Sequence, residues 1–556
     1  MRCDLALIHP PSVFDFRREV TFPGPISEVV PSAYVFDMYP YGFLTLASWL
    51  ESRGFRVGLF NLAAKMLLDR EFDPVDLLSR VEADVFGIDL HWMVHAHGAL
   101  EVARIVKELH PDSLVVLGGL SATYYWREVM EGHPYVDAVL RGDSTEEPLR
   151  QLLAHLRGDG PELAEIPNLC WRREGEVVVN PLRYVPGELG DFSNNYRHVV
   201  RSALRGRPSE LTPIHDWWEY PITAIMTCRG CVHNCIFCGG SNYALRRYAN
   251  RTRPAFRDPH RLVEDIRSAA ELSGGPIFVV GDLRQAGMEY ARTVLRGLRD
   301  LRLENQVVLE LFDAADPRYL EEVAEAIPRF NLQISPESHD EEVRRICGKP
   351  YDNRGLERTL RAAMEAGCGK LDVFFIIGLP RQDRASVMRT VEYAAELMDR
   401  FGPRLFPFIS PLAPFLDPGS RGYEEAERYG YRVRWRTLEE YRRALLLPSW
   451  KHTLSYETAW LSREEIVEVT YEAARVLNEH KLRAGLISPE EARRVAERID
   501  RSVRLLAEVD RAWQRGREPD LRLEDVMLSA LCEEREIRWP LRRRFRPLRI
   551  LRLLWR

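Results

Sequence analysis

Lysine, cysteine and long apolar runs are all scarce in this sequence. Only six of its 78 basic residues are lysines, and nine of its 556 residues are cysteines. Because four of these cysteines stand in one short run, the pattern indicates a metal site in a reducing compartment rather than a disulfide framework. No stretch approaches the roughly 18–20 apolar residues of a membrane-spanning helix. The first residues, MRCDLALIHPPSVFDF, hold too short an apolar run for a signal peptide, so we expect a cytoplasmic protein.

A strong positive charge is also missing. The net charge is −5, with 45% hydrophobic and 29% charged residues. This balance excludes the broad basic field of a nucleic-acid-binding protein and is typical of a globular chain. The length exceeds what one hydrophobic core serves, so we expect roughly two to four domains.

The first 160 residues alternate apolar strands with helical patterns. Strand patterns lie at 5–11, 55–62, 85–90, 113–119 and 136–143, and helical patterns at 42–54 and 99–110. This rhythm predicts a doubly wound parallel α/β sheet over 1–160. Ligands of such sheets bind beyond the carboxyl ends of the strands. Here those ends carry His9-Pro10-Pro11, Asp89-Leu90-His91, Gly118-Gly119 and Arg141-Gly142-Asp143.

A second alternating stretch follows a segment rich in Pro, Arg, Gly and Asn, which we predict to be a linker at 161–215. Six strand patterns then lie at 222–226, 276–281, 306–312, 332–335, 371–378 and 404–410, with helical patterns between them. Such a series matches a partial (β/α)6 barrel over 216–440 better than another open sheet. The loop PLAPFLDPGS (411–420) follows the last strand and is expected to border the substrate cavity.

Helices are predicted for the region 441–556. The last long helix begins with the capping signal Ser488-Pro489-Glu490-Glu491. The chain closes with WPLRRRFRPLRILRLLWR (539–556), a cationic amphipathic segment that could lie in a membrane interface. The alternatives are a tail packed on its own domain and a nucleic-acid arm.

Four cysteines, Cys228, Cys231, Cys235 and Cys238, lie in the run TCRGCVHNCIFCGG at 227–240. Thiolates suit zinc or iron–sulfur clusters. Structural zinc sites usually place two C-x2-C knuckles on separate turns, and the short spacing here leaves little room for that. Without Cys228 the spacing is C-x3-C-x2-C. Three thiolates can hold three irons of a [4Fe–4S] cluster and leave the fourth iron open.

Placed after the apolar strand ITAIM, this run resembles the signature of the radical S-adenosylmethionine (radical SAM) superfamily, and the resemblance continues over 222–410. It implies that Cys231, Cys235 and Cys238 ligate the cluster. SAM would chelate the open iron, and the reduced cluster would cleave it to a 5′-deoxyadenosyl radical that removes a hydrogen from substrate. Cys228 is expected to stand off the cluster, because a fourth thiolate on that iron would block SAM.

The same resemblance suggests the residues of a SAM pocket. Gly281-Asp282 occupies the place of the usual Gly-Gly-Glu that meets the SAM amino group, from which it departs. Ser335 and Glu337 at the fourth strand, Lys349 beyond it and Gly378 at the fifth strand are further candidates. Turn glycines and solvated charges are the alternatives. Cys347 is expected beside this pocket.

Followed by such a core, the first domain resembles the cobalamin (B12)-binding domain found at the start of many radical SAM enzymes, in VFGIDL, SLVVLGGLSA and VDAVLRGDSTEEPL. Gly118 and Gly119 would let the sheet edge approach a flat corrin, since glycine has no Cβ. Asp89-Leu90-His91 matches Asp-x-His, the axial-ligand motif, but Val94 replaces the glycine that continues it. We expect His91, Trp92, His95 and His97 to shape a pocket floor. The alternatives are that they cap the helix at 99, or that Trp92 fills the space a corrin needs. Relatives exist with and without bound cobalamin, and both states stay open.

Together these features predict a radical SAM enzyme that modifies an unactivated carbon of a hydrophobic substrate, with a lipid among the options. Methylation with cobalamin and radical C–C bond formation both fit. The expected cofactors are a [4Fe–4S] cluster, SAM and cobalamin. The expected partners are the substrate, an electron donor such as ferredoxin or flavodoxin and, through 539–556, a membrane surface, with no nucleic acid. The alternative is a non-catalytic sensor that binds structural zinc and a corrin.

Overall fold

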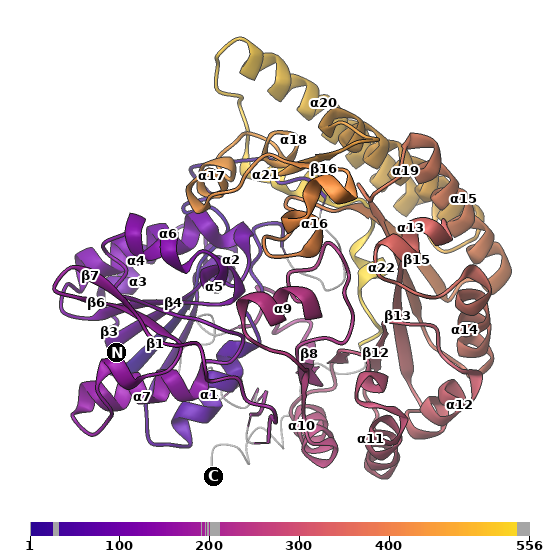
Figure 1. The fold of residues 1–556 in the computed structure, drawn as a ribbon. Coiled ribbons are helices and arrows are strands. Elements are labelled where there is room, and N and C mark those ends of the chain that lie inside the picture. Colours follow the sequence, from indigo (N-terminus) through magenta and orange to yellow (C-terminus); the bar gives the residue numbers. More distant parts are fainter. Residues whose placement is uncertain are drawn as a thin grey trace.

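The computed structural model describes residues 2–25, 33–190, 192–194, 196, 199–200 and 212–541. These residues form two large sheets, each with helices packed on it, and a helical region toward the end of the chain (Figure 1). The predicted α/β class is therefore confirmed. In Figure 1, strand β8 (Thr223–Met226), at one edge of the second sheet, and helix α9 (Asn242–Tyr248) lie between the main parts of the two sheets.

The first sheet has seven strands in the order β2-β1-β3-β4-β5-β6-β7. Its parallel part consists of the five strands expected from the sequence: β1 (Arg2–His9), β2 (Val57–Asn61), β3 (Glu82–Asp89), β4 (Leu114–Gly118) and β5 (Ala138–Leu140). The helices on it are α1 (Gly42–Glu51), α2 (Leu62–Leu68), α3 (Pro74–Ser79), α4 (Ala96–Leu109), α5 (Leu120–Tyr124), α6 (Trp126–Gly132) and α7 (Glu146–Arg157). The strands read as apolar runs because helices cover both faces of the sheet.

An antiparallel hairpin extends this sheet beyond residue 160. It consists of β6 (Leu169–Arg173) and β7 (Glu176–Val179), and β6 pairs with β5. The sequence does not predict it, because β7 is partly exposed and its polar and apolar residues do not alternate clearly. Part of the segment read as a linker therefore folds onto the first domain.

The second sheet is six-stranded and parallel, in the order β15-β14-β13-β12-β11-β8. All six predicted strands are present: β8 (Thr223–Met226), β11 (Ile277–Val280), β12 (Val307–Leu311), β13 (Phe330–Glu337), β14 (Leu371–Ile377) and β15 (Leu405–Pro411). The connecting helices are α10 (Pro259–Leu272), α11 (Met288–Leu301), α12 (Pro317–Ala326), α13 (Glu341–Ile346), α14 (Asn353–Glu365) and α15 (Arg384–Phe401). The strand order keeps β8 and β15 at opposite edges, which agrees with a partial barrel. A short ribbon, β9 (Cys228–Arg229) with β10 (Ala255–Phe256), follows β8.

Two long helices, α19 (Arg463–Arg483) and α20 (Pro489–Gln514), dominate the region after residue 440. As predicted, Ser488 caps α20 by accepting a hydrogen bond from the Glu491 amide. The shorter elements after β15 are α16 (Arg421–Glu424), β16 (Tyr431–Val433), α17 (Leu438–Ala444), α18 (Trp450–Thr453), β17 (Tyr456–Thr458), α21 (Leu523–Val526) and α22 (Glu534–Ile537). Strand β17, which pairs with β16, is a departure from the all-helical prediction for 441–556. Most of the predicted amphipathic segment 539–556 lies outside the described residues.

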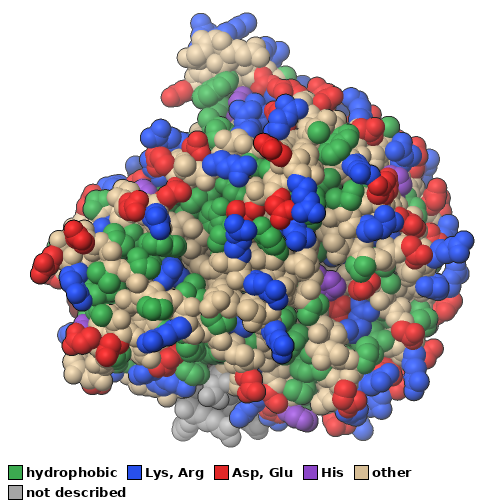
Figure 2. Space-filling model, viewed as in Figure 1, with side chains coloured by type: hydrophobic (Ala, Val, Ile, Leu, Met, Phe, Trp, Pro, Cys, Tyr) green, Lys and Arg blue, Asp and Glu red, His purple; other side chains and the backbone are tan. Residues whose placement is uncertain are grey.

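Side chains of both charges are interspersed on the face seen in Figure 2, without a large area of one sign. In the part of the chain that the structure describes, we find no helix with the length and apolar character needed to cross a membrane.

Candidate functional site

The cysteine loop, residues 230–240, connects β9 to α9 at the carboxyl end of β8. Backbone hydrogen bonds shape it: the Cys238 amide donates to the Cys235 carbonyl at 3.2 Å, and the Asn242 amide donates to the His233 carbonyl at 2.9 Å. The Ser241 side chain accepts from the Ala244 amide and so begins α9 directly after the loop. The three cysteines of the predicted signature are thus held on one turn between a strand and a helix.

A single zinc ion requires closely spaced ligand atoms. A tetrahedral zinc with Zn–S bonds of about 2.3 Å holds its sulfurs about 3.8 Å apart. Among the described residues, the group whose metal-binding atoms all lie within 4.8 Å of one another is His9, Asp89 and His95, and no cysteine of the loop belongs to such a group. Burial raises the pKa of Cys231 to about 11. Metal binding at this loop must therefore displace protons.

Cys228 is separated from the loop. It lies on β9, is buried, and its thiol donates to the Gly230 carbonyl at 3.4 Å. Burial raises its pKa. It sits on β9, just before the loop that carries the other three cysteines, and its position off a bound cluster stays a prediction.

The segment after α13 packs directly on the cysteine loop. The Cys347 carbonyl accepts from the Ile236 amide at 3.2 Å, and a Cβ on Gly348 would come within 2.8 Å of the Asn234 carbonyl oxygen. This contact places Lys349 beside the loop. The Cys347 thiol itself is buried.

Two of the candidates for the SAM pocket form a buried ion pair. Lys349 Nζ lies 3.4 Å from Glu337 Oε1, and both side chains are almost fully buried. Glu337 ends β13 with a φ of +67°, after an irregularity in the β13–β14 register. Its Oε2 has no hydrogen-bond partner among the described residues. A buried carboxylate oxygen without a donor is costly, so this atom is suited to a ligand that donates to it.

Arg344 holds the end of β13 in this shape. Its buried guanidinium donates to the carbonyls of Pro336, Ser338 and Tyr351. Burial lowers its pKa. Ser335, which precedes this turn, is half-buried on β13. The sequence did not single out Arg344.

Both carboxylate oxygens of Asp282 accept hydrogen bonds from other residues of the protein. Its Oδ2 accepts from the Phe312 amide at 2.9 Å, and both of its oxygens accept from Arg284. The carboxylate next to Gly281 is instead Glu310 of β12, which accepts a hydrogen bond from the Gly281 amide. Burial raises the pKa of Glu310 to about 7. The signal for Glu310 in the sequence is a lone glutamate within the apolar strand 306–312.

Gly378 is enclosed by the β16–β17 ribbon. It has a φ of +93°, and a Cβ there would meet the Tyr456 hydroxyl at 2.3 Å. The Gly378 carbonyl also accepts from the Tyr431 hydroxyl. Glycine is therefore required here for close packing as well as for the left-handed backbone.

A cavity of about 660 Å³ lies between the two domains. Its walls include the carboxyl ends of β1, β3 and β4, and both flanks of the cysteine loop at Gly230, Gly239 and Gly240. Asp417, Pro418 and Gly419 of the loop after β15 form another wall. The loop therefore borders this cavity, and its role at a substrate site stays a prediction.

Gly118 and Gly119 line this cavity in different ways. A Cβ on Gly118 would meet nothing closer than the Leu140 carbonyl oxygen at 3.9 Å, so the space above it is open. A Cβ on Gly119, whose φ is +111°, would come within 2.5 Å of the His91 Cα. Gly118 thus leaves room for a ligand, whereas Gly119 permits the close approach of the β3 loop.

A leucine at Gly118 should fill the cavity without straining the backbone. We expect Gly118→Leu to weaken hydroxocobalamin binding about 10- to 100-fold, the order of an overpacking cost of about 1–3 kcal/mol. Absorbance titration measures the affinity. Gly132→Leu is the matched control, since a Cβ there meets nothing within 4 Å and Gly132 lies outside the cavity lining. Equal affinities of the two variants for hydroxocobalamin would contradict a corrin site above Gly118.

The polar floor of the cavity contains His9, Asp89 and His95. His9 Nδ1 lies 2.9 Å from Asp89 Oδ1, and its Nε2 lies 2.9 Å from the Phe36 carbonyl. Both ring nitrogens face acceptors, so a protonated His9 paired with ionised Asp89 satisfies them. The Asp89 carboxylate raises the pKa of His9 against the opposing effect of burial. Asp89 Oδ2 has no partner among the described residues.

His91 and Trp92 are exposed to the cavity, while His95 and His97 are buried. His95 contacts the Pro10 carbonyl through Nδ1 at 3.1 Å, and burial lowers its pKa to about 3. His97 Nδ1 accepts from the Phe14 amide. Three of the four thus line the cavity, as predicted for a pocket floor, and His97 anchors a neighbouring loop.

Two buried ion pairs join the first domain to the cysteine loop region. Arg229, next to Cys228, pairs with Glu146 at the start of α7 and donates to Thr45 Oγ1 at 3.2 Å. Arg251 pairs with Asp143 and reaches Ser144 Oγ at 3.2 Å. The sequence places these residues more than 80 positions apart, so it carries no signal of their pairing.

Two family models each match a part of the chain. A B12 binding domain model matches residues 28–152, and a Radical SAM superfamily model matches residues 225–394. The predicted order of the two domains is confirmed, and these domain types support the predicted cluster, SAM and cobalamin as cofactors. The zinc-and-corrin sensor is not favoured.

Among curated proteins, the chain is similar to the cobalamin-dependent radical SAM methyltransferase TokK of Streptomyces tokunonensis (24% identity over 64% of this chain and 50% of TokK). It also resembles the hopanoid C-3 methylase of Methylococcus capsulatus, with 26% identity over 53% of this chain and 55% of that protein. With the uncharacterized methyltransferase PH0819 of Pyrococcus horikoshii it shares 24% identity over 76% of this chain and 83% of PH0819. The match therefore spans about half the length of the first two relatives.

The fold is also similar to a solved structure. The radical S-adenosylmethionine methyltransferase TsrM from Kitasatospora setae, with tryptophan substrate and a SAM analog bound, aligns over 88% of this chain and 89% of its own. The TM-score is 0.58 at 17% identity. This likeness establishes the shared arrangement of the domains.

Proposed function

Because the chain carries a B12-binding domain followed by a radical SAM domain, we propose that it is an enzyme that methylates an unactivated carbon of a hydrophobic substrate. The observation that carries this proposal is the cavity, which touches both the glycines of the first sheet and the cysteine loop of the second. A ligand in it can contact both domains at once. The methyltransferase relatives support methylation; C–C bond formation is the second candidate chemistry.

The chain offers a separate set of residues for each cofactor. Cys231, Cys235 and Cys238 would hold the cluster, and Gly118 and Gly119 would face the corrin. When bound, the cluster supplies the electron that cleaves SAM, and the corrin supplies a methyl carrier. The electron itself would come from a donor protein such as ferredoxin or flavodoxin.

Glu337 and Lys349 are proposed to hold SAM beside the cysteine loop. The Lys349 ammonium offsets negative charge near Cys235, since the two groups interact electrostatically, and it also keeps the Glu337 carboxylate in place. The unpartnered Glu337 Oε2 can then accept a hydrogen bond from a hydroxyl or an ammonium group. Ser335 on the same strand and Gly281 at the end of β11 complete the proposed pocket.

The cavity walls support a hydrophobic substrate. Most of the side chains that line the cavity are apolar or aromatic, and Phe43, Leu46, Leu189 and Phe192 are among them. Apolar walls bind through removal of water and select by shape. A lipid is one such substrate, and the similarity to a hopanoid C-3 methylase supports that choice.

Product analysis tests this function. The protein would be reconstituted anaerobically with iron and sulfide, loaded with hydroxocobalamin, and incubated with SAM and a reductant. We expect absorbance near the 400 nm region that is typical of iron–sulfur clusters, and formation of both 5′-deoxyadenosine and S-adenosylhomocysteine. Release of 5′-deoxyadenosine alone in the presence of substrate would favour C–C bond formation. Bound zinc in place of iron would contradict the proposal.

A further inference from the structure

Asp417 connects two walls of the cavity that belong to different domains. Its Oδ2 accepts from the Gly239 amide at 2.9 Å, and its Oδ1 accepts from Trp92 Nε1 at 3.0 Å. Gly239 follows Cys238 in the cysteine loop, and Trp92 follows β3 in the first domain. One carboxylate thus joins segments that are far apart in the sequence.

Both partners are donors, and this decides which side chain can stand at position 417. An indole Nε1–H and a backbone N–H can only donate, so both hydrogen bonds require acceptor oxygens. A carboxylate provides two acceptor oxygens, one for each donor. An asparagine provides one oxygen and one NH2 group, so it can satisfy only one of the two donors.

The orientation of the Trp92 ring depends on its bond to Asp417. Asp417 lines the cavity, and Trp92 is 47% exposed toward it, so the ring is held mainly on one side. Its edge contact with Phe36, at a ring-centroid distance of 5.7 Å, and its bond to Asp417 fix its orientation. On the other side, the Gly239 bond adds an external support directly after the last cysteine.

We propose that Asp417 is a positioning residue that couples the cysteine loop to the Trp92 wall of the corrin-facing cavity. This inference rests on the proposed function, because it assigns the two walls to the two cofactors. A change at Asp417 should therefore alter both the cysteine loop and the corrin side. A residue with a local packing role would show the same effect of Asp417→Asn whether or not Trp92 is present.

A double-mutant cycle tests this coupling. We expect Asp417→Asn to weaken hydroxocobalamin binding by the reconstituted protein about tenfold, the order of one lost hydrogen bond to a charged group. Trp92→Phe removes one donor and keeps an aromatic ring. In the W92F background the asparagine oxygen is free for Gly239, so Asp417→Asn should then change the affinity less than about twofold.

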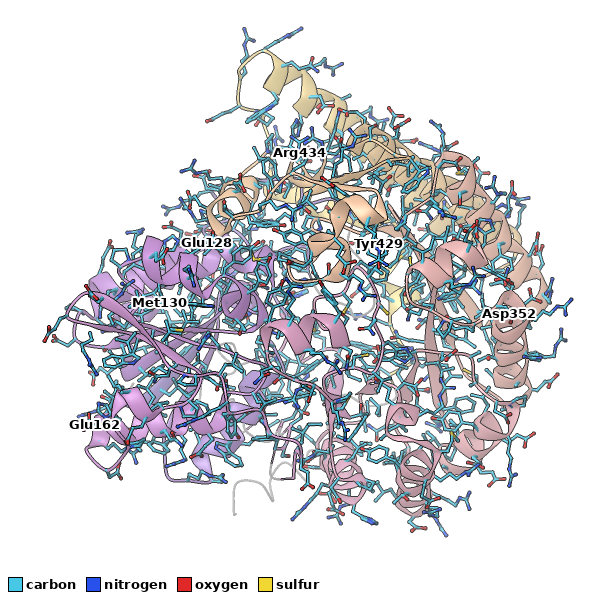
Figure 3. The ribbon with its side chains drawn as sticks, in the orientation of Figure 1. Glu128, Met130, Glu162, Asp352, Tyr429 and Arg434 are labelled. Atoms are coloured by element: carbon cyan, nitrogen blue, oxygen red, sulfur yellow. The ribbon has the colours of Figure 1, made fainter. Side chains whose placement is uncertain are left out.

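Hydrogen exchange gives a second reading that does not depend on a bound corrin. In D417N, the backbone amides of segments 88–95 and 236–245 should both exchange faster than in the wild type. In at least one of the two segments the rate should rise about tenfold. In W92F/D417N, segment 236–245 should exchange at the rate seen in W92F. The control is Glu128→Gln, whose carboxylate accepts a single hydrogen bond, from the Leu438 amide. Glu128 lies on α6, away from the cysteine loop (Figure 3). A glutamine there keeps one acceptor.

Equal effects of Asp417→Asn in both backgrounds would overturn the coupling, as would unchanged exchange in both segments. A wild-type protein that binds no hydroxocobalamin would instead contradict the proposed function. The exchange measurement would still test the link between Trp92 and Gly239 in that case. The two failures are therefore distinguishable.

Discussion

Replacing Cys231, Cys235 or Cys238 by alanine is expected to abolish the iron–sulfur centre, whereas Cys228→Ala retains it. Each of the three offers a thiol on the turn between β9 and α9, and two thiolates cannot hold a four-iron cluster with SAM on its open iron. The expected readings are about four irons and four sulfides per chain for the wild type and Cys228→Ala. We expect much less than half of that for the other three variants, with no 5′-deoxyadenosine formed from SAM.

Cys228 is the internal control for this experiment, because it is a cysteine of the same run with a buried thiol that donates to Gly230. Its loss should cost some stability through the vacated space and leave the iron content unchanged. Loss of iron in Cys228→Ala with retention in Cys231→Ala would reverse the ligand assignment. Iron and sulfide analysis, together with the spectrum of the reduced centre, decides between these two ligand assignments.

The second large effect is expected at the ion pair between Glu146 and Arg229. The two side chains are 1% and 12% exposed, so removing one partner leaves a buried charge uncompensated. Such a loss typically costs about 3–5 kcal/mol. We therefore expect Glu146→Leu to lower the free energy of unfolding by about this amount, measured by denaturant titration, and to loosen the cysteine loop.

Glu147→Gln is the control, since Glu147 pairs with Arg150 and the two side chains are 24% and 30% exposed. Solvent-exposed pairs contribute about 0–1 kcal/mol. The double variant Glu146→Leu/Arg229→Met should recover much of the lost stability, because it removes both charges. Recovery by the double variant separates a charge effect from a loss of volume. A loss as small for Glu146→Leu as for Glu147→Gln would contradict this account.

The pH dependence of this pair has a definite sign. Burial opposes ionisation of Glu146, but the Arg229 guanidinium outweighs it and holds the pKa of the carboxyl below its usual range. A lowered pKa in the folded state means that the stabilisation is present above the pKa of the unfolded chain. It is lost as the pH falls toward the folded pKa. Glu146→Leu should therefore flatten the acid side of the stability curve.

The alternation of strands and helices was readable from the sequence because both sheets are parallel and covered by helices. Each strand is then a short apolar run between turn residues, and all eleven predicted strands are present. The exceptions are the hairpin β6–β7 and the ribbon β16–β17. Their strands are short and partly exposed, so local patterning does not separate them from loops.

The sequence by itself determined the kind of chemistry, because the three cysteines of the signature lie within eight residues of one another in the chain and local spacing is enough to place them on one turn. It also indicated the glycines at the sheet edge. The partners of Glu310, Glu146 and Asp417 were decided only by the tertiary structure. Hydrogen bonds and ion pairs between distant segments depend on how the two domains pack, and a carboxylate has the same appearance in the sequence whether it is solvated or joins two domains.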